Sequence, residues 1–584
     1  MSIYDSSDEI SWRIQKRAVM TPIWVILETI CELFLTVTIG RFIDELSNSE
    51  TTMSLIYEYG LRLIIIAALC FVFGTICGWE PVKAASGLSK NLRNAMFDRI
   101  QDFSFTNIDR FSTNSLVTRM TTDVANVQNA FMMMLRVAAK APVSIVCALV
   151  MAFMINWKIG LVYIIVIPIL LVGLLIIARV THPIFERVFH TYDRLNGVVR
   201  ENLHGIRVVK GFVREDFESE KFKGISEDIR RDFIKAETTI AFNPFLMQFS
   251  IYLCLVLISW FSARAIVGVS GGISMTTGDL QNLITYAMMI LMSLMMLSMI
   301  YVMTMISREC VSRIREVLAE KPTIGAPEDA VKTIENGGID FEHVGFSYAD
   351  DPGKLCLSDI DLHIKSGETI GIIGGTGSGK SSLVQLIPRL YDATVGSVKV
   401  AGRDVREYDI EALRDAVAVV LQKNVLFAGT IKENLRWGKP DATDEEIAEV
   451  CRLSQADGFI SRFPDGYDSH IEQGGTNVSG GQKQRLCIAR ALLKRPKVLI
   501  LDDSTSAVDT RTDALIRKAF REYIPETTKI IIAQRISSVQ DADRIIVMDG
   551  GWIDAVGTHE ELLKSNKIYQ EVYDSQQKGG GDDE

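Results

Sequence analysis

The first half of the chain contains six apolar stretches, and each is long enough to cross a lipid bilayer as a helix. A hydrocarbon core of about 30 Å is spanned by about 20 apolar residues in a helix. The stretches therefore predict a bundle of six transmembrane helices. They lie near residues 18–40, 58–79, 141–156, 159–180, 241–267 and 281–306.

The distribution of positive charge predicts the orientation of these helices. The segments 81–140 and 181–240 are long, helical in periodicity and rich in Lys and Arg, whereas the other connections are short and poor in positive charge. Because cytoplasmic connections are enriched in Lys and Arg, we place both segments and both termini in the cytoplasm. The N-terminus is polar and charged through Arg17, and no small-residue cleavage pattern follows the first apolar stretch. This stretch is predicted to stay as a membrane anchor.

The second half of the chain has a different pattern. From about residue 337, short β-branched strands alternate with amphipathic helices, which is typical of an α/β domain with a parallel sheet. The length of 584 residues exceeds what one hydrophobic core usually organises. We expect a transmembrane domain over 1–312, a charged linker over 313–336, the α/β domain over 337–575 and a disordered tail over 576–584.

Net charge and cysteine usage exclude several functions. The formal net charge is −10, without a basic excess, so DNA and RNA are not expected partners. The nine cysteines show neither paired nor C-x-x-C spacing, and several (Cys31, Cys70, Cys147, Cys254) lie in apolar stretches. They are predicted to be reduced core residues and not a disulfide framework or a zinc site.

A glycine-rich motif predicts that the α/β domain binds a nucleotide. Residues 374–381 fit G-x-x-x-x-G-K-[ST], follow the β-branched strand 369–373 and lead into the helical sequence 382–387. The glycines let backbone N–H groups surround phosphate oxygens, Lys380 neutralises charge, and the Ser381 hydroxyl can hold Mg²⁺. The predicted phosphate site comprises Gly374, Gly375, Thr376, Gly377, Ser378, Gly379, Lys380, Ser381 and Ser382.

Two acidic residues in the first apolar stretch indicate a polar function inside the membrane. Glu28 and Glu32 lie four residues apart and therefore on one helical face. An unpaired carboxylate is costly in a membrane, so both should face a watery cavity or a partner. Two interpretations remain open. Either the pair lines a transport path and favours cationic cargo, or it forms hydrogen bonds or ion pairs with a structural role.

Methionines recur at roughly helical spacing on one face of the sixth stretch. Methionine is soft and repacks easily, as at surfaces that accept ligands of many shapes. The stripe predicts a hydrophobic substrate pocket, with ordinary helix packing as the alternative. Its members are Met288, Met292, Met295, Met296, Met299 and Met303.

Further motifs of the second half occur in a fixed order. They are Tyr348, the phosphate loop, Gln422, the run from Val478 to Gln482, Asp502, the run from Ser506 to Asp509, and Gln534. With these motifs and its six spans, the chain resembles a half-transporter of the ATP-binding cassette (ABC) exporter family over nearly its whole length. The segments 114–119 and 201–210 resemble cytoplasmic segments of such exporters, which implies coupling helices near 113–120 and 201–211.

The resemblance implies a role for each motif. Tyr348 would stack on the adenine of ATP, the alternative being a packed strand aromatic. Mg²⁺ and its waters would be served by Ser381, Gln422 and Asp502. In this family the signature residues press on the γ-phosphate of ATP held by the opposite subunit, so two chains are required. The ATP-contacting positions outside the phosphate loop are Tyr348, Gln422, Ser479, Gly480, Gly481, Gln482 and Asp509.

Three positions depart from the residues that the family usually carries. Asp503 replaces the glutamate that polarises the attacking water, and its carboxylate is one methylene shorter. Gln534 replaces the switch histidine near the γ-phosphate and cannot become a cation. Gln473 replaces a glutamate in a loop that faces the membrane domain. With Gln422, the first two are the catalytic candidates, and together they resemble the degenerate subunit of bacterial heterodimeric multidrug exporters.

The expected function is export driven by ATP. A homologous half-transporter with the active Glu and His is the predicted partner, and a homodimer is the alternative. The expected cargo is hydrophobic or amphipathic, moved out of the cytoplasm or inner leaflet of a bacterial cell membrane, with cationic compounds favoured if Glu28 and Glu32 line the path. Lipid or peptide export, or an ATP-gated or regulatory membrane protein, are the other possibilities.

Overall fold

The computed structural model describes residues 3–47, 52–267, 275–504 and 508–578. It divides into two compact units. The helical unit comprises Met1–Gln101 and Asn114–Ala319, and the α/β unit comprises Asp102–Thr113 and Glu320–Glu584. Each unit has a hydrophobic core of its own.

The helical unit confirms the six predicted transmembrane helices. Among the described residues, six helical segments are long and apolar enough to span a membrane: Lys16–Leu46, Met53–Gln101, Thr113–Ile155, Trp157–His204, Glu215–Ile266 and Thr277–Ala319. Their elements are α1 (Ile3–Leu46), α2 (Met53–Gln101), α4 (Thr113–Thr118), η1 (Arg119–Asp123), α5 (Val124–Met133), η2 (Met134–Ala138), α6 (Ala139–Ile155), α7 (Trp157–His204), α9 (Glu215–Ile240), α10 (Phe242–Ile266) and α11 (Thr277–Ala319).

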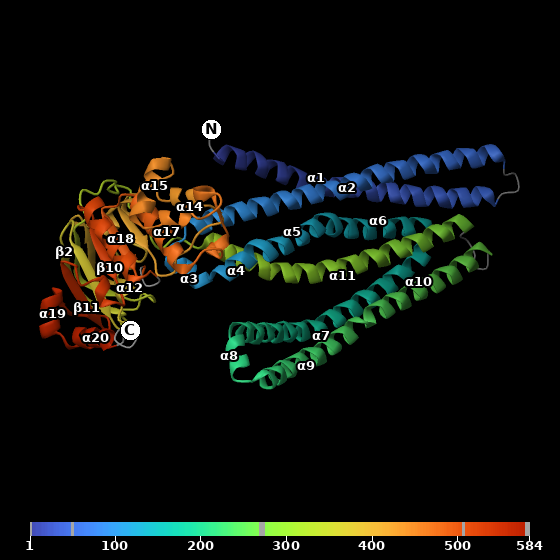
Figure 1. The fold of residues 1–584 in the computed structure, drawn as a ribbon. Coiled ribbons are helices and arrows are strands. Elements are labelled where there is room, and N and C mark those ends of the chain that lie inside the picture. The colour runs from blue at the N-terminus through green and yellow to red at the C-terminus, as the bar shows by residue number, and fades with distance from the viewer. Residues whose placement is uncertain (1–2, 48–51, 268–274, 505–507, 579–584) are drawn as a thin grey trace. The chain divides into compact units, whose positions relative to one another are not determined.

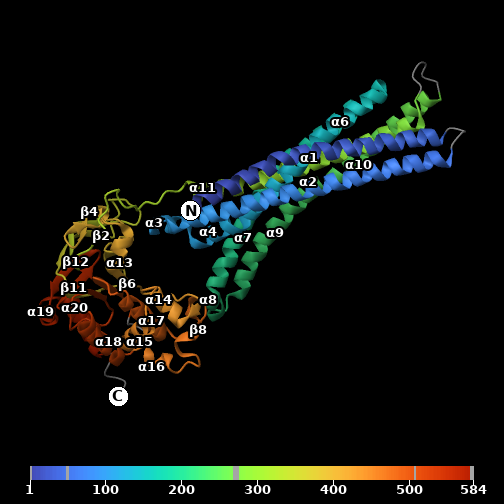
Figure 2. The same cartoon turned by 90° about the horizontal axis from the view of Figure 1, so that it is seen from above.

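Side-chain hydrogen bonds fix the arrangement of these helices. The side chain of Asn156 accepts bonds from the N–H groups of Lys158 and Ile159, which begins α7 directly after α6 and makes a tight turn. The buried hydroxyl of Tyr163 in α7 donates to the Leu283 carbonyl of α11 at 2.7 Å. Within this unit, α1 lies beside α2, and α7 and α9 form a hairpin closed by the short α8 (Ile206–Gly211) (Figures 1 and 2).

The α/β unit confirms the mostly parallel sheet. Its main sheet has the order β12-β11-β3-β10-β9-β6, and only β12 is antiparallel to its neighbour. These strands are β3 (Thr369–Gly374), β6 (Val417–Val420), β9 (Val498–Asp502), β10 (Thr528–Ile532), β11 (Arg544–Asp549) and β12 (Trp552–Gly557). The central strands β9 and β10 are mostly apolar and buried at every position, as expected for a sheet covered on both faces.

Smaller sheets and helices complete the α/β unit. An antiparallel sheet has the order β2-β1-β4-β5, and β7 pairs with β8. The remaining elements are β1 (Ile339–Phe346), β2 (Leu357–Ile364), β4 (Val395–Val400), β5 (Arg403–Asp404), β7 (Gly429–Thr430), β8 (His470–Ile471), α3 (Phe105–Phe111), α12 (Lys380–Gln385), α13 (Ile410–Ala416), α14 (Ile431–Arg436), α15 (Asp444–Leu453), α16 (Asp457–Ile460), α17 (Gly480–Leu493), α18 (Thr510–Tyr523), α19 (His559–Ser565) and α20 (Lys567–Lys578), with the 3₁₀ turns η3 (Val405–Glu407), η4 (Gly466–Asp468), η5 (Gln473–Gly475) and η6 (Ile536–Ser538).

Register brings three sequence motifs to one edge of the main sheet. Ile532 of β10 pairs with Asp502 of β9 on one side and with Ile372 of β3 on the other. The three parallel strands therefore end almost level. The phosphate loop follows β3, Asp503 follows β9 and Gln534 follows β10, so this carboxyl edge gathers the predicted nucleotide site.

The boundaries of the units differ from the predicted domain ranges. Residues 102–113, expected in the membrane domain, belong to the α/β unit. Helix α11 continues through 313–319, expected in the linker, because Arg313 pairs with Asp123 and Val317 is fully buried. Helix α20 extends to Lys578, three residues into the predicted tail, while residues 579–584 lie outside the described ranges.

Candidate functional site

The phosphate loop adopts a conformation that requires glycine. Gly379 has a φ of +92°, and a Cβ atom there would lie 2.6 Å from a methyl carbon of Leu357. Lys380 opens α12, and its Nζ donates to the carbonyls of Gly374 (2.9 Å) and Gly375 (2.7 Å). Burial lowers the pKa of Lys380. The loop thus holds an ammonium group among backbone atoms, where phosphate oxygens would be attracted.

Two hard oxygen donors meet beside this loop. The hydroxyl of Ser381 donates to Oδ1 of Asp502 at 3.1 Å, and Asp502 is buried. Burial raises the pKa of Asp502, and the charge of Asp503 adds to this effect. A hydroxyl and a carboxylate side by side are suited to Mg²⁺, which prefers oxygen ligands. Gln422, the third predicted metal ligand, bonds Asp503 instead of either of these oxygens.

The three catalytic candidates are brought together at the carboxyl edge. Nε2 of Gln534 donates to Oδ2 of Asp503 at 2.7 Å, and Nε2 of Gln422 donates to the same oxygen at 3.3 Å. Asp503 is only 8% exposed, and its φ of +48° lies in the left-handed region, which is uncommon for a residue with a side chain. Burial raises the pKa of Asp503. Two neutral amides therefore hold one carboxylate oxygen.

Tyr348 lies in a group of aromatic rings next to the phosphate loop. Its hydroxyl bonds Ser382 at 2.9 Å, and its ring meets Phe346 and Tyr391 edge-on. The residue is nevertheless 50% exposed. The position of Tyr348 is therefore compatible with both predicted roles, a packed strand aromatic and a ring that stacks on adenine. Its ring contacts other aromatic rings edge-on, and half of the residue is exposed to solvent.

Tyr391 connects these rings to α3, and sequence analysis did not identify it. Its hydroxyl donates to Oδ2 of Asp109 at 2.7 Å, and its ring lies 6.0 Å from that of Phe105. Burial raises the pKa of Tyr391, as does the bond to Asp109, so the hydroxyl stays protonated and donates. Neither Tyr391 nor Asp109 belongs to a sequence motif of the site. Because they lie 282 positions apart, no local sequence pattern predicts that they meet.

Helix α3 is also bonded to Glu320, the residue that follows α11. Ser104 caps its N-terminus in a capping box with Asn107. Nδ2 of Asn107 donates to Glu320 at 2.8 Å, and Glu320 pairs with Arg110 at 3.0 Å. Helix α3 is therefore part of the α/β unit, and it ends just before the predicted coupling segment 113–120.

The second predicted coupling segment, 201–211, lies at the tip of the hairpin of α7 and α9. It contains α8 and presents apolar side chains to solvent. Leu203 and Val208 are exposed, and Phe212 directly after α8 is 76% exposed. An apolar tip of this kind is typical of a surface that meets another protein.

The signature residues begin helix α17. Ser479 is its N-cap and forms a capping box with Gln482. Ser479 and Gly480 are exposed, so the first N–H groups of the helix face outward, where they can attract an anion. Asp509 caps α18 by accepting from the N–H of Thr512 at 2.9 Å, which holds its pKa below the usual value. Ser506 and Ala507 lie outside the described residues, and Gln473 is exposed in η5.

In the helical unit, Glu28 and Glu32 share one cation. Nζ of Lys140, in α6, lies 3.0 Å from Glu28 and 2.8 Å from Glu32 of α1. Glu28 is 8% exposed. These contacts are the ion pairs expected if Glu28 and Glu32 have a structural role. Lys140 was not predicted as the partner of these acids, because it lies just outside the apolar stretch 141–156.

The methionine stripe lies on the open face of α11. Met288, Met292, Met295, Met296 and Met299 are exposed, and Met303 is half-buried. The opposite face of the helix is buried and contains Ala287, Ile290, Leu291 and Leu294. Packing within the helical unit therefore does not account for the five exposed methionines.

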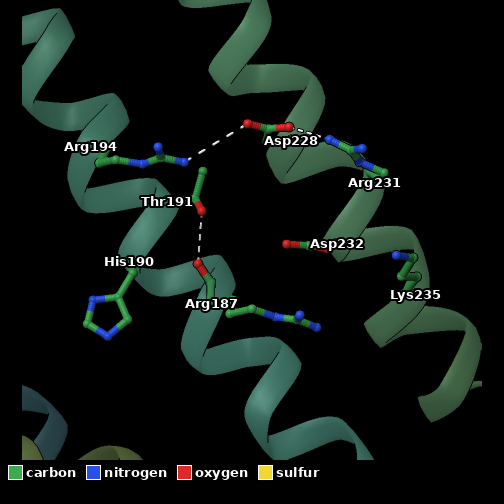
Figure 3. Close-up of a pocket in the computed structure, with 8 residues that line it drawn as sticks. All are labelled: Arg187, His190, Thr191, Arg194, Asp228, Arg231, Asp232 and Lys235. Atoms are coloured by element: carbon green, nitrogen blue, oxygen red, sulfur yellow. Dashed lines mark hydrogen bonds and ion pairs between the residues drawn. The ribbon is translucent and has the colours of Figure 1, made fainter.

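An open groove of about 630 Å³ lies between α7 and α9 (Figure 3). Its lining is charged, and Asp228 pairs with Arg231 from its own helix and with Arg194 across the groove at 4.0 Å. None of the predicted substrate-path residues lines it. Its mixed charges do not fit the expected hydrophobic cargo.

Two family models match the chain. The ABC transporter transmembrane region matches residues 19–308, and the ABC transporter model matches residues 357–506. The uncharacterized ABC transporter ATP-binding protein YfiB of Bacillus subtilis is 34% identical over 554 residues, which are 95% of each chain. The chain belongs to the ABC transporter family. With its own six spans and ATPase domain, it is an ABC exporter half-transporter, a multi-pass membrane protein whose ATPase domain is cytoplasmic.

Other members of the ABC transporter family are also similar. The probable multidrug resistance ABC transporter ATP-binding/permease protein YheI of Bacillus subtilis is 29% identical over 556 residues, covering 94% of this chain and 93% of YheI. A fatty acid ABC transporter ATP-binding/permease protein of Mycobacterium bovis is 32% identical over 528 residues, which cover 88% of this chain and 80% of that protein. The solved structure of a bacterial Atm1-family ABC exporter with ATP bound has a TM-score of 0.80 at 23% identity over 96% and 98% of the two chains, and thus has the same fold.

Proposed function

We propose that this ABC exporter chain is the degenerate-site subunit of a heterodimer. The observation that carries the proposal is the carboxylate of Asp503, which is shorter than glutamate and is held by two neutral amides. A general base must reach the attacking water, and a displacement of about 1 Å can cost roughly 100-fold. Gln534 can donate a hydrogen bond near the γ-phosphate but cannot carry the charge or proton of a histidine.

The chain would bind ATP through the residues of the carboxyl edge. Backbone N–H groups of the phosphate loop and Lys380 hold the phosphates, and Tyr348 stacks on the base. Mg²⁺, held by Ser381 and Asp502 with Gln422 nearby, would neutralise phosphate charge. The outward-facing start of α17 completes the ATP site of a homologous half-transporter, which carries the active Glu and His. Hydrolysis then takes place mainly in the partner's site.

Two cytoplasmic elements would carry the closure of the ATPase domains to the membrane helices. Within this chain, α3 is tied to the nucleotide-binding aromatics through Tyr391 and Asp109. The apolar tip at α8 would dock on the partner's ATPase domain. Closure would turn a cavity from cytoplasm-facing to outward-facing.

The proposed cargo is hydrophobic or amphipathic. The five exposed methionines of α11 support this, because thioether side chains repack around ligands of many shapes. The two carboxyl groups of Glu28 and Glu32 share one lysine, which favours a cationic compound if the cluster reaches the path. The similarity to a fatty acid transporter keeps lipid export as the second candidate.

The ATPase activity of the purified complex tests the degenerate site. Asp503→Asn should change the rate by less than about twofold, because the chain's own site contributes little. Replacement of the partner's corresponding glutamate by glutamine should lower the rate about 100-fold or more. Equal losses from the two substitutions, or rapid ATP hydrolysis by a homodimer of this chain, would contradict the assignment.

The coupling role of α3 predicts a separate result. Tyr391→Phe keeps the ring but removes the hydrogen bond to the exposed Asp109 carboxylate, at a cost of about 0.5–1.5 kcal/mol. Substrate transported per ATP hydrolysed, measured in sealed vesicles, should fall about tenfold, while ATPase activity stays within about twofold. The control is Tyr408→Phe, since the Tyr408 hydroxyl donates to the Val400 carbonyl, which is not part of α3. Equal effects of both variants would indicate loss of stability instead of coupling.

A further inference from the structure

The turn after β10 is held by a side chain from the C-terminal helix. This turn contains Gln534 and leads into η6. Gln576 of α20 bonds it twice: Nε2 donates to the Gln534 carbonyl at 2.7 Å, and Oε1 accepts from the N–H of Ile536 at 2.9 Å. Ile536 is 2% exposed, and a buried N–H group requires a partner. One carboxamide therefore satisfies two backbone groups of the turn.

Helix α20 is anchored in the core by residues that precede Gln576, while the Gln576 side chain itself is exposed. Tyr569 is fully buried, and its hydroxyl bonds Nδ1 of His559 at 2.7 Å. Val572 and Tyr573 pack against the same core. Gln576 follows Tyr569 by seven residues and therefore lies on the same face of the helix. The core thus determines where this carboxamide meets the turn.

We propose that Gln576 is a positioning residue for Gln534, and that α20 is part of the nucleotide site. By fixing the backbone on both sides of Arg535, Gln576 sets the reach of the Gln534 amide to Asp503. The inference rests on the proposed role of Gln534 near the γ-phosphate. It also accounts for the residue type: an amide both donates and accepts, whereas a carboxylate would repel the Gln534 carbonyl and an ammonium could not accept from Ile536.

The test measures the affinity of this chain's own ATP site. The purified complex is labelled with an azido-ATP photoprobe, and the two polypeptides are separated on a gel. Gln576→Leu and Gln576→Glu should each weaken labelling of this chain about threefold to tenfold, since each loses at least one hydrogen bond of about 0.5–1.5 kcal/mol. The matched control is Gln577→Leu in the same helix, whose side chain bonds Tyr573 and not the turn; it should stay within about twofold.

A double-substitution cycle separates positioning from a purely structural effect. If Gln576 acts through Gln534, then Gln576→Leu adds little to the loss already caused by Gln534→Ala. Equal losses in the wild-type and Gln534→Ala backgrounds would overturn the positioning role, as would unchanged labelling of Gln576→Leu. If Gln534→Ala alone has no effect while Gln576→Leu does, the proposed function of Gln534 fails and the positioning role fails with it. If Gln534→Ala weakens labelling and Gln576→Leu does not, only the positioning role fails.

Discussion

Gly480→Asp should lower the ATPase activity of the complex roughly 100-fold or more. Gly480 is the first residue of α17, which is proposed to face the γ-phosphate of ATP on the partner. Two negative charges about 5 Å apart repel each other by about 3 kcal/mol at an effective dielectric constant of about 20, so a carboxylate beside that phosphate would strongly disfavour ATP. An acidic residue in the first turn is favourable for the helix itself, so folding should not suffer. The loss would therefore report on the ATP site.

The matched control for this variant is Gly458→Asp. Gly458 lies in the short α16, is exposed, and has no neighbouring atom within 4 Å of an added Cβ. This variant should hydrolyse ATP at the wild-type rate. If Gly480→Asp retained more than half of the wild-type activity, the start of α17 would not face a γ-phosphate.

Lys140→Met should strongly destabilise the helical unit. The substitution keeps the length and the apolar stem of the side chain but leaves Glu28 and Glu32 without their shared cation. Glu28 is buried, and removing the partner of a buried charge typically costs about 3–5 kcal/mol, whereas the Glu32 side chain is 35% exposed and adds less. The measurement is equilibrium unfolding of the purified protein in mixed detergent micelles.

A compensated variant shows whether charge is the cause of this loss. Glu28→Gln with Glu32→Gln and Lys140→Met removes all three charges at nearly constant volume. It should recover most of the lost stability, since a buried ion pair is often no better than neutral groups of the same shape. If the triple variant were as unstable as Lys140→Met, packing and not charge would explain the effect.

Features encoded by local periodicity could be predicted from the sequence. Six spans followed from apolar length, the parallel sheet followed from alternating strands and helices, and the phosphate loop followed from glycine spacing. The meeting of Asp503 and Gln534 is also understandable, because both follow strands that lie side by side in a parallel sheet. The sequence does not state, however, that Gln534 bonds Asp503 directly, since side-chain direction depends on the left-handed φ of Asp503.

Contacts between distant segments could not be predicted in this way. Tyr391 meets Asp109, Lys140 meets Glu28, and Gln576 meets the turn at Gln534, and none of these pairs has a shared periodicity. Individually, a tyrosine after a helix, a lysine at the end of a span and a glutamine in the last helix are ordinary residues. Each of these residues meets its partner only because the folded backbone brings two distant segments together.

The exposed apolar tip of the hairpin of α7 and α9 also has a consequence for the synthesis of this protein in the cell. A subunit that displays Phe212 and its neighbours without a mate is exposed to chaperones and proteases that survey newly made proteins. In the proposed heterodimer, surplus copies of this chain would be cleared, so its abundance would follow that of the partner chain. Balanced synthesis of the two chains, for example from adjacent genes, would then be required by the exposed apolar side chains at and beside α8.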